Sequence, residues 1–307
     1  MRLTTGQPLT TCSTLSNTSG PRCGSPASAA DPPPATESRQ PMTSPSAFGI
    51  HHLRRSSSPG PQLWLLHGVY TDHHLWETTL AHLDPAVAPD VVALDSPGHG
   101  TAGPASVLPS LDGQVESLAQ VIREEALGPV TLAGHSWGGM LGLRLALSHP
   151  ELLHGLVLVN TPLRRTVGTT RLAFEAQRTM VAVGLPLRAY GRLAARSLYG
   201  ESYFRQHPGI ARTTGEIVAS LGRKGTVSVI RRVLLEPDDS IEMLRSTPVA
   251  TTLVAGEDDY VGAGPVPRLL RSAGHTLLRH PGGHMGPAEA PEVVAAVLRT
   301  ALMQAST

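Results

Sequence analysis

Ser136 lies in a segment whose residue types suit a catalytic nucleophile: residues 134–139 read Gly-His-Ser-Trp-Gly-Gly. Residues 129–133 form a short β-favouring run before it, and residues 140–147 after it are apolar enough for a buried helix. A Gly-x-Ser-x-Gly segment between a strand and a helix forms a sharp turn, the nucleophile elbow, that exposes the serine hydroxyl. The two flanking glycines leave the space this turn needs, and the helix aims its first N–H groups at developing negative charge. The segment therefore predicts a serine nucleophile.

The rest of the chain alternates between predicted strands and predicted helices. The strands are expected at residues 63–66, 90–94, 129–133, 156–160, 251–256 and 276–280, and helices over 111–127 and 288–302. Such alternation predicts an α/β fold with a doubly wound, mostly parallel sheet. Ligands of these folds bind beyond the carboxyl ends of the strands. Polar residues that follow predicted strands are His67, Ser136, Asp259 and His284.

Composition divides the 307 residues into four parts. Residues 1–47 are rich in Ser, Thr, Pro and Gly and lack periodicity, which predicts a disordered tail or a stretch upstream of a true start at Met42. Residues 48–162 and 248–307 carry the predicted strands of the core. Residues 163–247 are helical by composition and too long for an ordinary connection. They predict a helical cap inserted over the active edge of the sheet.

The predicted cap is basic, with 14 basic and 7 acidic residues, whereas the whole chain has a net charge of +1. The arginines either form a solvated surface or attract an anionic substrate, such as a carboxylate or a coenzyme A thioester. Both interpretations remain open. The small overall charge predicts no bulk attraction to nucleic acid or to a membrane surface.

Several other classes of protein are disfavoured by composition and spacing. The two cysteines, Cys12 and Cys23, lie in the N-terminal stretch and cannot form a disulfide framework for the core. We expect a cytoplasmic protein, because there is no apolar run of 18 residues and no secretory signal pattern.

Residues 72–74 read Asp-His-His, but the spacing lacks the metallo-hydrolase pattern, so no metal is expected. The first strand is followed by no dinucleotide-binding glycine pattern, and no cofactor is expected.

These features together resemble the α/β-hydrolase superfamily, in particular its capped serine-hydrolase branch. The resemblance covers residues 60–302 and is weakest across the predicted cap. It rests on motifs in the family's order: His67-Gly68 with Trp76 nine residues on, residues 95–100 (DSPGHG), residues 134–139 (GHSWGG), residues 149–151 (HPE), residues 256–259 (GEDD) and Gly283-His284. The family's fold hosts many chemistries, so the resemblance implies the fold more specifically than the substrate.

The resemblance implies a Ser-His-Asp triad, in the family's chain order of serine, acid and histidine. Ser136 is the nucleophile, and His284, directly after the last predicted strand, is the base. The family places the acid three residues after the glycine that ends a strand, here Gly256, which selects Asp259. Asp258 is the alternative acid.

The resemblance also implies an oxyanion hole. One backbone N–H donor follows the nucleophile, at Trp137, and the other follows His67-Gly68, at Val69. His67 is expected to brace this loop rather than to take part in the chemistry. The side chains of Trp137 and Tyr260 are candidates for contact with a substrate.

The leading hypothesis is a cofactor-independent serine hydrolase for a small carboxylic ester, thioester or lactone, acting through an acyl-enzyme. Alternatives with the same triad are a C–C bond hydrolase or lyase and an acyltransferase. An alternative of another class is a protein that binds a small ligand on the same scaffold without turnover. The oligomeric state is unreadable from the sequence.

Overall fold

A computed structural model describes residues 47–56, 60–88, 90–259 and 276–305 of the chain. Except for Ala47, the predicted tail over residues 1–47, including both cysteines, lies outside the described residues. Among the helices that the structure describes, none is both long enough and apolar enough to cross a membrane.

The described residues form a seven-stranded sheet in the order β1-β3-β2-β4-β5-β6-β7. Neighbouring strands are parallel except for the edge pair β1 and β3, which is antiparallel. The predicted doubly wound, mostly parallel sheet is thus confirmed, and β1 is a strand that the sequence analysis did not predict. The strands are β1 (Gly49–Arg54), β2 (Gln62–Leu66), β3 (Asp90–Asp95), β4 (Val130–His135), β5 (Leu153–Val159), β6 (Thr251–Gly256) and β7 (Thr276–His280).

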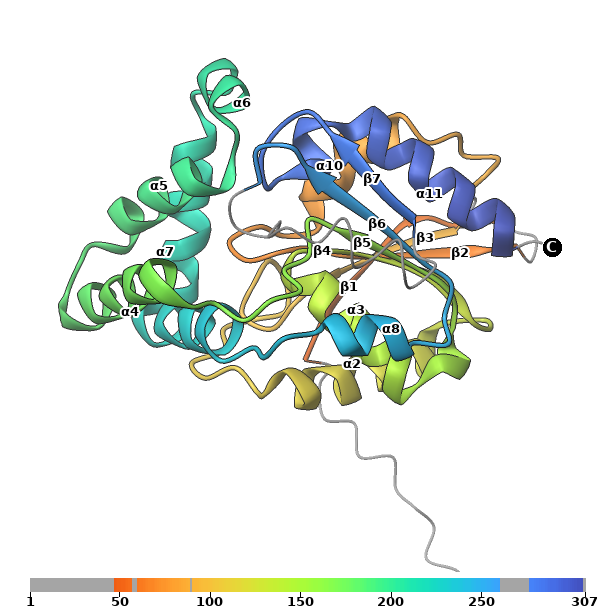
Figure 1. Ribbon diagram of the computed structural model, residues 1–307, viewed down its shortest axis with the longest axis horizontal. Coiled ribbons are helices and arrows are strands. Elements are labelled where there is room, and N and C mark those ends of the chain that lie inside the picture. The colour runs from red at the N-terminus through yellow and green to blue at the C-terminus, as the bar shows by residue number, and fades with distance from the viewer. Residues whose placement is uncertain (1–46, 57–59, 89, 260–275, 306–307) are drawn as a thin grey trace, which may run out of the picture. The chain divides into compact units, whose positions relative to one another are not determined.

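Helices cover both faces of this sheet (Figure 1). One layer contains α2 (Leu111–Glu125), α3 (Trp137–Ser148) and α8 (Ile241–Ser246), and the other contains α1 (Glu77–Ala81), α10 (Gly286–Glu289) and α11 (Pro291–Ala305). Because both faces are covered, β2, β3 and β4 are buried along their whole length. Short 3-10 turns, η1 (His73–Trp76) and η2 (Pro150–Leu152), precede α1 and β5.

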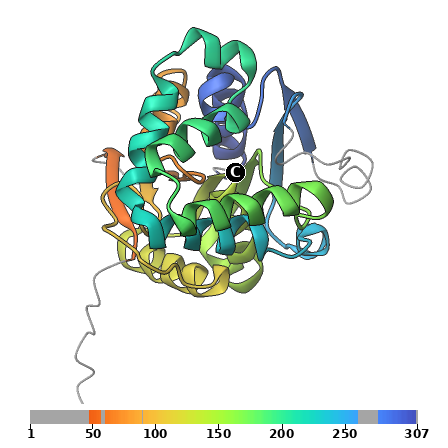
Figure 2. The same cartoon turned by 90° about the vertical axis from the view of Figure 1, so that its left-hand side faces the viewer.

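Between β5 and β6 the chain forms a separate group of helices beside the sheet, seen face-on in Figure 2. These helices are α4 (Gly168–Val183), α5 (Leu187–Leu198), α6 (Glu201–Gln206), α7 (Ile210–Val229) and a π-helical turn, η3 (Ile230–Leu235). Helices α5 and α7 pack closely because two glycines meet: a Cβ on Gly191 would lie 2.6 Å from the Cα of Gly215. The last helix of the segment predicted as a cap, α8, instead packs against α3 in the core.

Candidate active site

Ser136 occupies a strained turn between β4 and α3. Its φ of 49° and ψ of −109° lie outside the regions that residues with a Cβ usually adopt. The Ser136 N–H donates to the Val159 carbonyl at 2.9 Å, which ties the turn to β5. A Cβ on Gly134 would overlap the backbone of Gly138, and one on Gly138 would lie 2.6 Å from the Leu66 Cβ. Both glycines are therefore sterically required here.

The side chains of Ser136, His284 and Asp259 form a chain of hydrogen bonds. Ser136 Oγ lies 2.8 Å from His284 Nε2, and His284 Nδ1 lies 2.9 Å from Asp259 Oδ1. The carboxylate only accepts, so His284 Nδ1 donates to it and His284 Nε2 accepts from the serine hydroxyl. Each of the three residues exposes at most 4% of its surface. The arrangement contains the atoms needed for a histidine to deprotonate a serine.

The structure distinguishes between the two candidate acids. Asp259 is buried and contacts His284, whereas Asp258 is exposed and its backbone N–H donates to the Gly282 carbonyl at 3.0 Å. The structure therefore brings together the three residues implied by the resemblance and leaves the Asp258 carboxylate outside this chain of hydrogen bonds.

Asn160 is a second partner of the Asp259 carboxylate, and the sequence analysis did not identify it. Its Nδ2 donates to Asp259 Oδ2 at 2.8 Å and to the Gly283 carbonyl at 3.2 Å, and its Oδ1 lies 3.1 Å from His280 Nε2. Asn160 is fully buried with a φ of 49°, a conformation that asparagine tolerates better than most residues. An asparagine directly after a buried strand was the available signal, but no local pattern links it to a residue 99 positions later.

Two backbone contacts hold the candidate base in place. His135 Nε2 donates to the His284 carbonyl at 2.8 Å, and the His284 N–H donates to the Leu198 carbonyl of α5 at 3.1 Å. Burial lowers the pKa of His135 to about 3, so this imidazole is neutral and keeps the donor role. The variable position of the elbow motif thus supports the backbone of His284.

The candidate oxyanion donors flank the serine. Val69 lines the same cavity as Ser136 and His284. Trp137 is the first residue of α3, so its N–H is one of the helical donors without an intrahelical acceptor. The neighbouring N–H of Tyr70 is engaged differently, because it donates to His99 Nε2 at 3.3 Å. These placements suit the two predicted backbone donors.

Trp137 and Tyr260 are the two residues whose side chains are candidates for contact with a substrate. The Trp137 indole is fully buried and donates to Gln114 Oε1 at 3.1 Å, and it lies outside the lining of the cavity beside Ser136. Its side chain therefore packs in the core. Tyr260 lies outside the described residues.

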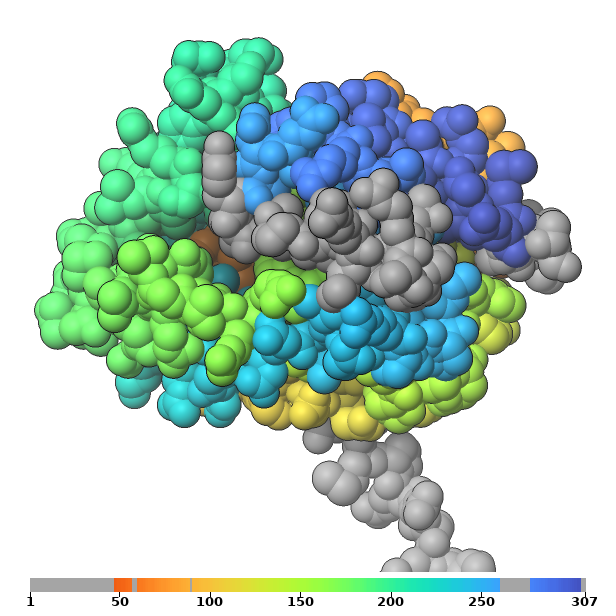
Figure 3. All heavy atoms as spheres, viewed as in Figure 1, coloured from red at the N-terminus to blue at the C-terminus, as the bar shows by residue number. Residues whose placement is uncertain are grey.

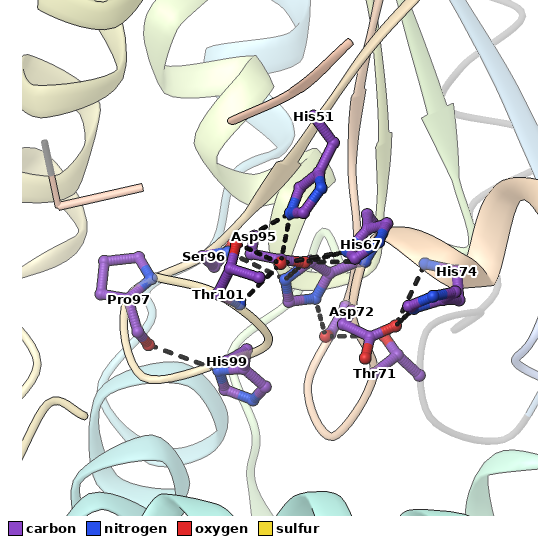
Figure 4. Close-up of polar contacts among 12 residues, drawn as sticks. His51, His67, Thr71, Asp72, His74, Asp95, Ser96, Pro97, His99 and Thr101 are labelled. Carbon is purple, nitrogen blue, oxygen red and sulfur yellow. Dashed lines mark hydrogen bonds and ion pairs between the residues drawn. The ribbon is translucent and has the colours of Figure 1, made fainter. Parts of the chain in front are cut away.

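His67 braces the loop that carries Val69 (Figure 4). Its Nδ1 donates to the Gly68 carbonyl at 2.7 Å, and its Nε2 accepts from the Ser96 N–H at 2.9 Å. Burial lowers the pKa of His67, which keeps the ring neutral and able to play both roles. The loop after β2 is thereby tied to the end of β3.

Asp95 is the centre of a second polar cluster next to this loop (Figure 4). It accepts hydrogen bonds from the Thr101 N–H at 2.8 Å, His51 Nε2 at 2.9 Å and His73 Nδ1 at 3.0 Å, and the two imidazoles stack at 3.6 Å. Burial alone would raise the pKa of Asp95, but hydrogen bonds from the backbone N–H groups of Thr101 and His73 hold it well below its usual range. His51, His73 and Asp95 offer ligand atoms close enough for one cation, as do Asp72, His73 and His74. In the structure these atoms satisfy one another as hydrogen-bond donors and acceptors.

Two cavities meet at His284. The smaller, of about 350 Å³, is lined by Val69, Ser136 and mostly apolar residues of α4 and α5. The larger, of about 960 Å³, is more polar and is lined by Asp258 but not by Ser136. The surface of the inserted helices is hollowed between α4 and the α5–α6 segment (Figure 3). If the scissile bond of a substrate lies at Ser136, one side of the substrate can therefore occupy the mostly apolar cavity and the other side the more polar cavity.

A mostly parallel sheet with a strained serine between strand and helix defines the class of α/β-hydrolase folds. The chain belongs to the alpha/beta hydrolase family, whose model matches residues 65–297.

The chain is similar to proteins named as a lipase and as esterases. Lipase LipV of Mycobacterium tuberculosis is 32% identical over 112 residues, which cover 36% of this chain and 41% of LipV. The pimeloyl-[acyl-carrier protein] methyl ester esterase of Neisseria meningitidis is 28% identical over 212 residues, which cover 65% of this chain and 76% of that protein. A thermophilic esterase from Thermogutta terrifontis has a TM-score of 0.71 at 21% identity, with 85% of this chain and 94% of that chain covered. This structural likeness shows a shared fold, and the match to LipV spans less than half of LipV.

Proposed function

We propose that this chain is a cofactor-independent serine hydrolase that cleaves a small carboxylic ester, thioester or lactone. The observation that carries the proposal is the chain of hydrogen bonds from Ser136 through His284 to Asp259, beside a mostly apolar cavity. The similarity to proteins named lipase and esterase supports the same class of reaction.

The first half of the proposed reaction acylates the serine. Ser136 Oγ attacks the carbonyl carbon while His284 Nε2 takes the hydroxyl proton, and Asp259 stabilises the imidazolium. The N–H groups of Val69 and Trp137 stabilise the oxyanion. The tetrahedral intermediate then breaks its bond to the leaving oxygen or sulfur, which takes the proton from His284. In the second half, water loses a proton to His284 and attacks the acyl-enzyme. The bond between the acyl carbon and Ser136 Oγ then breaks as His284 returns that proton to Oγ, which releases the acid and restores the serine hydroxyl.

The two cavities suit the two parts of such a substrate. The oxyanion must lie near Val69, which lines only the smaller cavity, so the acyl group belongs there. The leaving group must receive its proton from His284, which also lines the larger cavity. We therefore assign an apolar acyl group to the smaller cavity and a more polar leaving group to the larger one.

The positive charge of the inserted helices bears on an anionic substrate. Several arginines pair with nearby glutamates: Arg171 and Arg178 with Glu175, Arg205 with Glu201, and Arg231 and Arg232 with Glu236. Arg196 lines both cavities, is exposed, and lies over the Phe204 ring at 5.5 Å. A substrate that carries a negative charge is therefore proposed to place it near Arg196, in the larger cavity.

Hydrolysis of p-nitrophenyl esters with acyl chains of increasing length tests the proposal. The wild type is expected to release p-nitrophenol catalytically, and Ser136→Ala to lose a factor on the order of 10³ or more in kcat. A folded wild type without turnover of any ester or thioester, or near-normal turnover by Ser136→Ala, would contradict the proposal.

A further inference from the structure

The smaller cavity contains one group of polar side chains that the proposed reaction does not use. Tyr70 Oη lies 3.0 Å from Tyr190 Oη, and Tyr190 Oη donates to Gln177 Oε1 at 3.2 Å. We call these three residues the Tyr–Tyr–Gln trio. They come from the loop after β2, from α5 and from α4, and all three line the cavity. Much of the remaining wall is apolar, with Phe174, Met180, Leu185 and Leu193 among the residues of α4, α5 and the turn between them.

The hydrogen bonds of the trio share one donor direction, from Tyr70 through Tyr190 to Gln177. Because the Gln177 oxygen only accepts, the single hydroxyl proton of Tyr190 is directed to it, and Tyr70 must then donate to Tyr190. This leaves the Gln177 amide nitrogen with two N–H donors. Within the described part of the chain, no protein atom accepts a hydrogen bond from that nitrogen. Gln177 lines this cavity and the larger one, so the trio offers a hydrogen-bond donor where the two cavities share lining residues, and both tyrosine protons orient its amide.

The trio is more than the packing of this cavity wall requires, which argues that it has a function. Tyr70 and Tyr190 each expose only 2% of their surface, and phenylalanine would fill the same space without a buried hydroxyl. Tyr70 also has a φ of 58°, a left-handed conformation that is unfavourable for a bulky residue. Its N–H bond to His99 holds it in this conformation directly beside the oxyanion loop.

The trio is also electrically neutral. Burial raises the pKa of Tyr70 well above its usual value and raises that of Tyr190 to about 12, so both hydroxyls stay protonated at neutral pH. Arg196 and Gln177 both line this cavity and the larger one, and Arg196 is exposed. Because the side chains of the trio carry no charge, the trio itself suits a neutral acceptor better than a carboxylate.

We propose that the Gln177 amide, oriented by Tyr190 and Tyr70, donates a hydrogen bond to a neutral carbonyl oxygen within the acyl chain of the substrate. This inference rests on the proposed function, because that function assigns the acyl chain to the smaller cavity, which the trio lines. The substrate class is then esters or thioesters of oxo-acids, which carry an apolar chain and one internal ketone.

The test compares p-nitrophenyl heptanoate with its isomers that carry a ketone at carbon 4, 5 or 6. In the wild type, at least one keto ester should be preferred by about tenfold in kcat/KM, the ratio that one well-formed neutral hydrogen bond provides. In Gln177→Leu this ratio should fall to about one, since the donor is removed. Tyr190→Phe, which keeps the ring and removes the orienting hydroxyl, should lose part of the ratio. Gln206→Leu is the matched control, because Gln206 is exposed on α6 and lies outside both cavities, and it should keep the full ratio.

A binding measurement distinguishes failure of this inference from failure of the proposed function. The Ser136→Ala protein is titrated calorimetrically with methyl heptanoate and its keto isomers, and the same preference is expected, again lost with Gln177→Leu. If the wild type cleaves no ester but this preference in binding remains, the proposed function fails and the subsite stands. If the wild type prefers no keto isomer, or if the preference survives in both Gln177→Leu and Tyr190→Phe, the inference is overturned.

Discussion

The Asn160 side chain donates to Asp259 Oδ2 at 2.8 Å, on the carboxylate oxygen opposite the one that contacts His284. The candidate acid is therefore held from two sides by groups on different parts of the sheet. Asn160 follows β5, and Asp259 follows β6, the neighbouring strand. The orientation of His284 thus depends on a contact that lies outside the triad itself.

Asn160→Gly is expected to lower kcat/KM for an ester by about 10–100-fold, because the carboxylate loses a charge-assisted hydrogen bond. Glycine is the suitable replacement because it accepts the positive φ at this position. The measurement is steady-state hydrolysis, with circular dichroism to verify the fold. An unchanged kcat/KM in a folded variant would show that this contact does not position Asp259.

The assignment of the acid is tested by a matched pair of substitutions. Asp259→Asn should reduce kcat by about 10⁴, since the amide cannot hold His284 in the tautomer that accepts the serine proton. Asp258→Asn should keep a kcat close to that of the wild type, because the exposed Asp258 side chain lies outside the chain of hydrogen bonds. Any effect should be on KM, since Asp258 lines the larger cavity. Equal losses in the two variants, or a larger loss in Asp258→Asn, would reverse the assignment.

The protein should lose stability as the pH falls, because burial lowers the pKa of several histidines, His67 among them. Burial lowers the pKa of both His99 and His135 to about 3, whereas an unfolded histidine titrates near about 6.5. Between these values the unfolded chain binds protons that the folded chain does not, so the free energy of unfolding decreases as the pH falls. The slope should approach about 1.4 kcal/mol per pH unit for each histidine.

Urea unfolding between about pH 7 and pH 5, above the usual titration range of carboxyl groups, measures this slope. His135→Asn should flatten it, and the exposed His82→Asn should leave it unchanged. A slope that is identical in the wild type and in His135→Asn would be inconsistent with a neutral, buried His135.

The elbow predicts a strong difference between two glycine substitutions. Gly134→Ala places a Cβ against the backbone of Gly138, so we expect a loss of about 1–3 kcal/mol or more in the free energy of unfolding. Gly128→Ala meets no atom within 4 Å and should change stability little. Thermal unfolding of the two variants checks this, and equal stabilities would mean that Gly134 has room for a Cβ.

Much of the sheet could be predicted from the sequence, because its strands are apolar runs that end at glycine, asparagine or polar turns. The strand β1 was not predicted, since Gly49–Arg54 contains two histidines and an arginine in place of an apolar run. Its position depends on antiparallel pairing with β3, about 40 residues later in the chain, and this is a tertiary rather than a local signal.

The candidate site, too, could be predicted from the sequence only where a local pattern identifies the residue. Ser136 and its glycines follow from a local turn, so a short motif identifies them. Asn160 depends on contacts between distant segments, and the trio depends on how α4 and α5 pack over the loop after β2. Their roles therefore became visible only when the separate elements were brought together.

Reaction with a fluorophosphonate, which phosphonylates activated serines, followed by mass spectrometry tests directly whether His284 activates Ser136. We expect one adduct, located on Ser136, in the wild type, and none at that position in Ser136→Ala. His284→Ala should react far more slowly, because the hydroxyl loses its base. Absence of an adduct on folded wild type, or equal labelling of wild type and His284→Ala, would contradict the claim that His284 activates Ser136.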